Sequence, residues 1–110
     1  MQDSGRPVTV IAAGEELDVS TGGAMRDRLR RATEDGAGFI VADLTATRFL
    51  DSTGLGVLVG GLRRAWAAGC GFGIACPYEP VRRVFQISGL TRVLDVRDSV
   101  ESFTSATADG

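Results

Sequence analysis

Residues 39–62 read FIVADLTATRFLDSTGLGVLVGGL, and two kinds of structure alternate within them. Residues 39–42 form a short continuous apolar run, which is typical of a buried β-strand. The Asp-Ser-Thr sequence at 51–53 supplies residue types that begin helices. From there to about residue 68, apolar residues recur at helical spacing. A buried strand followed by a long helix predicts one α/β unit.

The same alternation continues on both sides of this unit. Before it lie a strand at 7–13 and a helix with Met25, Leu29 and Ala32 on one side, behind the candidate caps Asp18, Ser20 and Thr21. After it lie a strand at 71–75, a helix opened by Glu79-Pro80 and ended at Gly89, a strand at 93–96, and a last helix bearing Val100 and Phe103 behind Asp98-Ser99. Strands that alternate with helices predict a single α/β domain with its core at about 8–103. We expect a mixed, mostly parallel β-sheet of about four to five strands with about four helices.

Composition narrows the possible functions. Hydrophobic residues make up 44% of the 110 residues and charged residues 24%, which is ordinary for a globular domain. The net charge of −2 gives no positive field for nucleic acid or an anionic membrane. Apolar stretches are too short to span a membrane, and residues 1–7 lack the pattern of a signal peptide. We therefore expect a cytoplasmic protein with neither a nucleic-acid nor a membrane partner.

The chain contains no histidine, which excludes Ser-His-Asp and Cys-His catalysis and every metal motif that needs histidine. Cys70 and Cys76 bracket a predicted strand, so they would lie about 20 Å apart at 3.3 Å per residue. A disulfide between them is excluded at that distance, and two cysteines alone make a poor metal site. We expect free thiols, no metal, no cofactor and no catalytic activity.

The helix at 52–68 is unusual in its small residues. Its predicted core side carries Leu55, Leu58, Val59, Leu62 and Trp66, and its opposite side carries Ser52, Thr53, Gly56, Val57, Gly60, Arg63, Arg64 and Ala67. Each helix-interior glycine costs about 1 kcal/mol relative to alanine. Close approach of another backbone would compensate, either from a second protein or from a neighbouring helix of the same domain. The two arginines are read as solvated, or as contacts for a partner's acidic groups.

Ser52 has two compatible interpretations. It can cap the helix through its hydroxyl, or it can accept a phosphate, because a helix N-terminus offers free N–H groups and a positive dipole end. A phosphate would add a charge of about −2 beside Asp51. Nucleotide binding is disfavoured, since the glycines have GxGxxxG spacing and lie about ten residues beyond the strand. The absence of lysine also excludes a P-loop.

These residues carry a family resemblance. Phe49-Leu50-Asp51-Ser52-Thr53-Gly54-Leu55-Gly56-Val57-Leu58 resembles the signature of the STAS domain in bacterial anti-sigma-factor antagonists. The segments at 14–18, 41–44 and 89–93 resemble further family segments in the same order. The resemblance extends from about residue 8 to about residue 103.

The resemblance implies a partner-switching role. Unphosphorylated antagonists bind an anti-sigma factor and release a sigma factor. The anti-sigma factor is typically also a GHKL-type serine kinase, and a PP2C-type phosphatase reverses its action. Ser52 would be the phosphoacceptor. The implied partner-binding residues are Asp18, Asp51, Thr53, Gly54, Gly56, Val57 and Gly60.

Two departures and two alternatives accompany the resemblance. The Gly-Glu-Glu-Leu-Asp loop at 14–18 is one residue longer than the usual form, which leaves the placement of Asp18 open. Residues 1–6 have poor strand character, so the edge at 8–13 would be exposed and available for weak pairing with a second copy. An alternative function is that of a STAS module in a stress-sensing, transporter or lipid-transport assembly. A small enzyme or nucleotide-binding domain is the other.

Overall fold

Four parallel strands form the centre of the protein, in the order β1-β3-β5-β6. They are β1 (Val8–Ala12), β3 (Phe39–Asp43), β5 (Gly71–Ala75) and β6 (Asp95–Arg97). The computed structural model describes residues 7–104. The register aligns Val10 with Val41, and Val41 with Gly73. The expected α/β domain with a mostly parallel sheet is confirmed.

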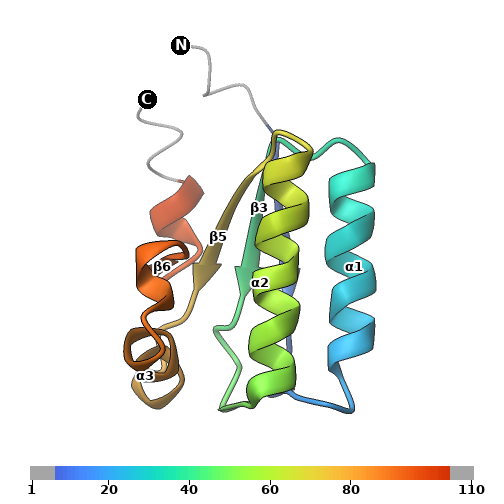
Figure 1. Cartoon of the computed structure of the whole chain (residues 1–110). Coiled ribbons are helices and arrows are strands. Elements are labelled where there is room, and N and C mark those ends of the chain that lie inside the picture. The colour runs from blue at the N-terminus through green and yellow to red at the C-terminus, as the bar shows by residue number, and fades with distance from the viewer. Residues whose placement is uncertain (1–6, 105–110) are drawn as a thin grey trace.

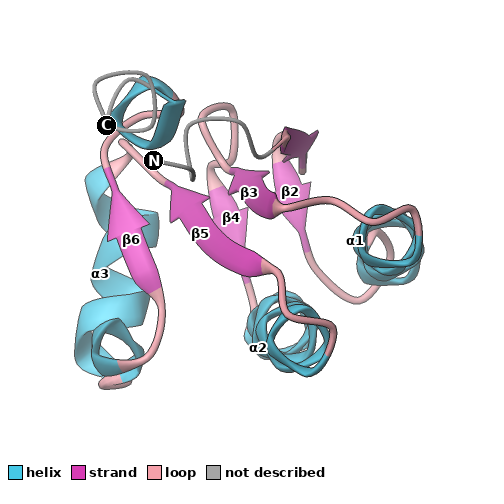
Figure 2. Cartoon of the chain, turned by 90° about the horizontal axis from the view of Figure 1, so that it is seen from above, coloured by secondary structure: helices cyan, strands magenta, loops and turns pink. Residues whose placement is uncertain are grey.

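Helices connect the parallel strands. They are α1 (Gly22–Glu34), α2 (Ser52–Ala67) and α3 (Glu79–Ile87), and residues 101–104 are also helical. Figure 1 shows α1 and α2 side by side, running along the sheet in the direction opposite to its strands. Viewed from above, α1 and α2 lie on one side of the sheet and the C-terminal helical segment lies on the other (Figure 2).

The main core fills the space between the sheet and the three long helices. Ile40 and Ile74 from the sheet are fully buried there with Leu29 of α1, Leu58 of α2 and Phe85 of α3. The predicted apolar side of α1, with Met25, Leu29 and Ala32, is therefore confirmed. This packing places the N-terminus of α2 beyond the carboxyl ends of the strands, where loops gather.

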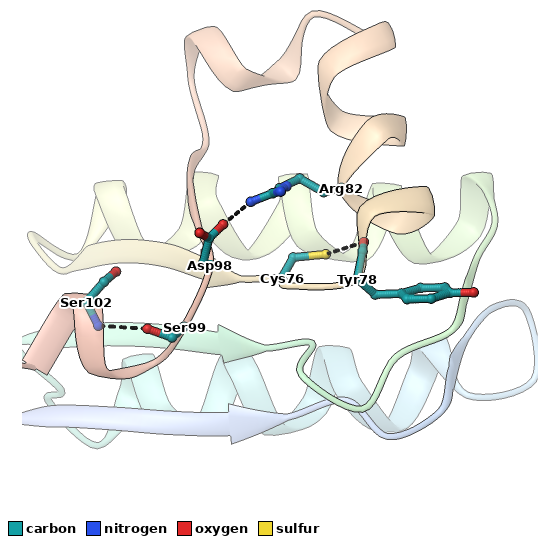
Figure 3. Close-up of polar contacts among 6 residues, drawn as sticks. All are labelled: Cys76, Tyr78, Arg82, Asp98, Ser99 and Ser102. Atoms are coloured by element: carbon teal, nitrogen blue, oxygen red, sulfur yellow. Dashed lines mark hydrogen bonds and ion pairs between the residues drawn. The ribbon is translucent and has the colours of Figure 1, made fainter.

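The opposite face of the sheet has a smaller core around Phe103. The Phe103 ring packs 5.7 Å from that of Phe39, and it occupies the space that a side chain at Gly73 would take. The predicted last helix is supported at its start, since the backbone N–H of Ser102 donates to Ser99 Oγ at 3.2 Å. Figure 3 shows this contact.

The last strand lies two residues later than predicted. We expected residues 93–96, but Val93 is 48% exposed and the strand begins at Asp95. The reason is a turn of 3-10 helix at Leu90–Arg92, which follows Gly89 in the left-handed conformation with φ of 77°. The turn closes on Val93 and Leu94, whose backbone N–H groups donate to the Leu90 carbonyl at 3.0 and 2.7 Å, so these two residues do not join the strand. The expectation for residues 1–6 lies outside the described residues.

The predicted core side of α2 was also wrong in part. Trp66 is 58% exposed, whereas the buried positions are Gly54, Val57, Leu58, Gly61, Leu62 and Ala65. Small residues are buried because α2 packs closely on its neighbours. A Cβ at Gly61 would lie 3.1 Å from Leu29 of α1 and 3.3 Å from Phe72 of β5. Contacts within the domain therefore explain why position 61 is a glycine.

Candidate functional site

Two loops meet at the N-terminus of α2. A second, two-stranded sheet pairs β2 (Glu16–Leu17) with β4 (Phe49–Leu50) in parallel, with Leu17 opposite Leu50. Asp18 and Asp51 follow these strands directly, so they emerge at the same end of the pair. The backbone N–H of Asp51 donates to the Leu17 carbonyl at 3.3 Å. The structure therefore settles the placement of Asp18 beside the Asp-Ser-Thr motif.

Asp51, and not Ser52, caps α2. The Asp51 backbone is extended, and its Oδ1 accepts a hydrogen bond from the Gly54 N–H at 2.9 Å. Ser52 is the first residue of the helix and its side chain is exposed. Within residues 7–104 the Ser52 hydroxyl has no hydrogen-bond partner. This hydroxyl is therefore free to react without loss of the cap.

We expect Asp51→Ala to lower the free energy of unfolding by about 1 kcal/mol, because the first turn of α2 loses its cap. Asp51→Asn should retain most of that stability, since asparagine caps as well as aspartate. Urea unfolding followed by circular dichroism measures both. Equal losses in the two variants would show that the charge, and not the cap, supports the helix.

Asp18 organises the loop into α1. Its Oδ1 accepts hydrogen bonds from the Ser20 hydroxyl at 2.8 Å and from the backbone N–H groups of Ser20 and Thr21 at 3.0 and 3.2 Å. The hydrogen bond from the Ser20 side chain is the main cause that lowers the pKa of Asp18. Asp18 is thus a stable anion. Among the candidate caps, Thr21 holds the N-cap position without a capping side-chain bond.

The predicted site residues divide into exposed and buried groups. Thr53 and Gly56 are exposed and Gly60 is half-buried. Gly54 and Val57 are buried, which corrects their placement on the contact surface. Gly54 lies against β2, because a Cβ there would be 2.2 Å from the Leu17 carbonyl oxygen. Val57 turns toward α1, where a Cβ at Gly22 would be 3.2 Å from its Cγ2.

Two exposed apolar side chains complete the region, and the sequence pattern did not indicate either. Val19, next to Asp18, is 77% exposed, and Phe49, on β4, is 51% exposed. The feature of the sequence that could have indicated them is that Val19 adjoins Asp18 and Phe49 lies two residues before Asp51. A surface with exposed apolar groups, carboxylates and a free hydroxyl is suited to contact with another protein.

The one cysteine with a perturbed pKa lies elsewhere. Cys76, at the end of β5, is fully buried, and its thiol contacts the Tyr78 carbonyl at 3.9 Å (Figure 3). Burial raises the pKa of Cys76 to about 11, although Arg82 opposes the shift. Such a thiol stays protonated at neutral pH, so it is a poor nucleophile. Arg82 itself pairs with Asp98.

We expect Cys76 to weaken the fold at alkaline pH. Its pKa is raised from 9.0 to about 11, so the folded state binds the proton more tightly than the unfolded state. This contribution is fully present below pH 9 and is lost between pH 9 and 11, at a cost of at most about 3 kcal/mol. Urea unfolding across this range should show a steeper decline for the native protein than for Cys76→Ala. Parallel curves would contradict the assignment.

The comparisons with known proteins agree with this geometry. The family model described as "STAS domain" matches residues 3–103. The chain belongs to the STAS domain family. The anti-sigma-B factor antagonist of Staphylococcus aureus strain NCTC 8325 is 31% identical over 91 residues, covering 83% of this chain and 84% of the relative. The anti-sigma-B factor antagonist of Bacillus subtilis strain 168 is 33% identical over 89 residues, covering 81% of this chain and 80% of the relative.

Solved structures of one antagonist resemble this STAS domain in two states. Unphosphorylated SpoIIAA, an anti-sigma factor antagonist, superposes with a TM-score of 0.75 at 26% identity, over 92% of this chain and 89% of SpoIIAA. The phosphorylated form of SpoIIAA, from Bacillus, gives a TM-score of 0.69 at 26% identity, over 92% of both chains. No helix within residues 7–104 has the length and apolar character to cross a membrane.

Proposed function

We propose that this STAS protein is an anti-sigma-factor antagonist that is switched by phosphorylation of Ser52. The unphosphorylated form binds an anti-sigma factor, which releases a sigma factor, and the phosphorylated form does not bind. One observation carries the proposal: in the described part of the chain the exposed Ser52 hydroxyl has no hydrogen-bond partner, and it lies at a capped helix N-terminus beside Asp51 and the Asp18 loop. The names of the relatives and the two states of SpoIIAA support the same role.

The geometry supports a charge-based switch. The Asp51 carboxylate already accepts the Gly54 N–H, and Asp18 is held as an anion in the neighbouring loop. A phosphate on Ser52 adds a charge of about −2 to this acidic surface. A partner that fits the unmodified surface then meets the volume of the phosphate group and a more negative electrostatic potential. Because the Ser52 side chain is exposed and its hydroxyl has no hydrogen-bond partner within residues 7–104, we expect the domain itself to stay intact.

The partners follow from the same proposal. The anti-sigma factor is a serine kinase of the GHKL type that acts on Ser52, and a PP2C-type phosphatase restores the binding form. The contact surface comprises Asp18, Asp51, Thr53, Gly56 and Gly60, together with the exposed Val19 and Phe49. The STAS protein catalyses none of these steps, and the switch operates in the cytoplasm.

A pull-down tests the proposal, with Ser52→Ala and Ser52→Asp as matched baits in lysate of the native organism. We expect the alanine bait to retain a GHKL-type kinase or anti-sigma factor, identified by mass spectrometry, and the aspartate bait to lose it. Equal recovery, or no such protein, would reject the switch. That result would favour a STAS module of another assembly.

A further inference from the structure

One row of α2 connects Ser52 to an arginine without any side chain between them. Positions 52, 56, 60 and 64 are each four residues apart, so consecutive members are neighbours in one row that winds slowly around the helix. No heavy atom lies within 4 Å of a Cβ placed on Gly56. At Gly60, within the described residues 7–104, the atom in that range is Nη2 of Arg64, at 3.6 Å. The backbone of α2 is therefore open at Gly56, and the Arg64 guanidinium lies over Gly60.

Among the ion pairs of residues 7–104, none involves the Arg64 guanidinium. It lies back along the helix toward Gly60, and its Nη1 atom is buried without a hydrogen-bond partner. The acidic groups of the adjacent α1 that form ion pairs, Asp27 and Glu34, are both paired with Arg30. A buried donor without an acceptor is costly, and more so when it is charged.

We propose that Arg64 is a specificity-determining contact that receives a carboxylate from the anti-sigma factor, whose backbone or short side chains approach α2 over Gly56 and meet the guanidinium at Gly60. The inference rests on the proposed function and adds the chemistry of the partner. Charge complementarity selects an acidic group, because the guanidinium has no acceptor of its own. The bare helix surface lets the partner come close enough to supply one.

The position of Arg64 also gives the contact a direction. The Arg64 guanidinium lies over Gly60, eight residues beyond Ser52, which is about 12 Å along the helix axis. The surface thus has carboxylates at one end of the glycine row, at Asp18 and Asp51, and a cation at the other. A partner with the reverse order of charges fits in one orientation only.

Two measurements on Arg64→Met test the inference, with Arg83→Met as the control. Methionine replaces the stem of Arg64 and removes the unpartnered guanidinium, so we expect thermal unfolding at or above the native temperature. Arg83 is exposed on α3, outside the proposed contact surface. Affinity for the purified anti-sigma factor retained by the Ser52→Ala bait should fall at least tenfold in Arg64→Met and stay within twofold in Arg83→Met.

The outcomes separate this inference from the proposed function. Native affinity in Arg64→Met, with the native protein still binding, would overturn the carboxylate contact and leave the antagonist role standing. Unfolding of Arg64→Met several degrees below the native protein would show that the guanidinium supports the fold, which also overturns the inference. Recovery of no anti-sigma factor by the alanine bait would reject the antagonist role itself.

Discussion

Gly54→Ala is expected to lower the free energy of unfolding by about 3 kcal/mol or more, because its Cβ has no space. The added atom would lie 2.2 Å from the Leu17 carbonyl oxygen and 2.9 Å from the Leu17 carbonyl carbon. Both are backbone atoms that cannot rotate away. Either β2 or the first turn of α2 must move, and the hydrogen bond from Asp51 to Leu17 would break with that movement.

Gly56→Ala is the matched control for this prediction. It is two residues further along the same helix, and no heavy atom lies within 4 Å of its Cβ position. Alanine should stabilise this variant by up to about 1 kcal/mol, since it is the better helix former. Urea unfolding of both variants measures the difference. Similar free energies would show that β2 is not held closely against α2.

The Gly54 variant also tests how the two loops depend on each other. Leu17 precedes Asp18, so a displaced β2 carries the Asp18 loop away from Ser52. We therefore expect Gly54→Ala to impair partner binding even at temperatures where it remains folded. The buried glycine would then serve the site by joining its two loops, although it does not reach the surface.

The elements of the fold were predictable because their apolar periodicity is strong. The strands at 39–43 and 71–75 and the buried side of α1 agree with the sequence pattern. The strands β2 and β4 have two residues each, which is too short for any periodicity to reveal. These two strands are nevertheless what brings Asp18 beside Asp51, so the sequence indicated the site residues without their arrangement.

The face of α2 was mispredicted for a different reason. Periodicity is dominated by large apolar side chains, and it therefore assigned Trp66 to the core. The tight packing of α2 on α1 and β5 instead selects residues that occupy little space, such as Gly61 and Ala65. Because periodicity is dominated by large side chains, it also did not distinguish the glycines by what they pack against. A side chain at Gly54 or Gly61 would meet packed neighbours within the domain, whereas one at Gly60 would meet only the end of the Arg64 side chain and one at Gly56 would meet none of the described residues within 4 Å.

Phosphorylation of Ser52 is expected to weaken binding to the anti-sigma factor at least 100-fold, which corresponds to about 2.7 kcal/mol. Two effects contribute. The phosphate is bulky at the start of an otherwise bare helix row, and like charges placed against one another cost several kcal/mol at an interface. Ser52 is exposed and without a partner, so the unfolding temperature should change by only a few degrees. Calorimetric titration of the phosphorylated and unphosphorylated proteins measures the loss.

The position of the charge, and not the net charge, should decide this result. Gln86→Glu adds one negative charge on the exposed surface of α3, and Ser52→Asp adds one at the proposed switch. We expect native affinity from the first variant and a clear loss from the second, although one carboxylate carries less charge than a phosphate. If both variants bind equally well and phosphorylation is also without effect, the acidic surface around Ser52 is not the switch.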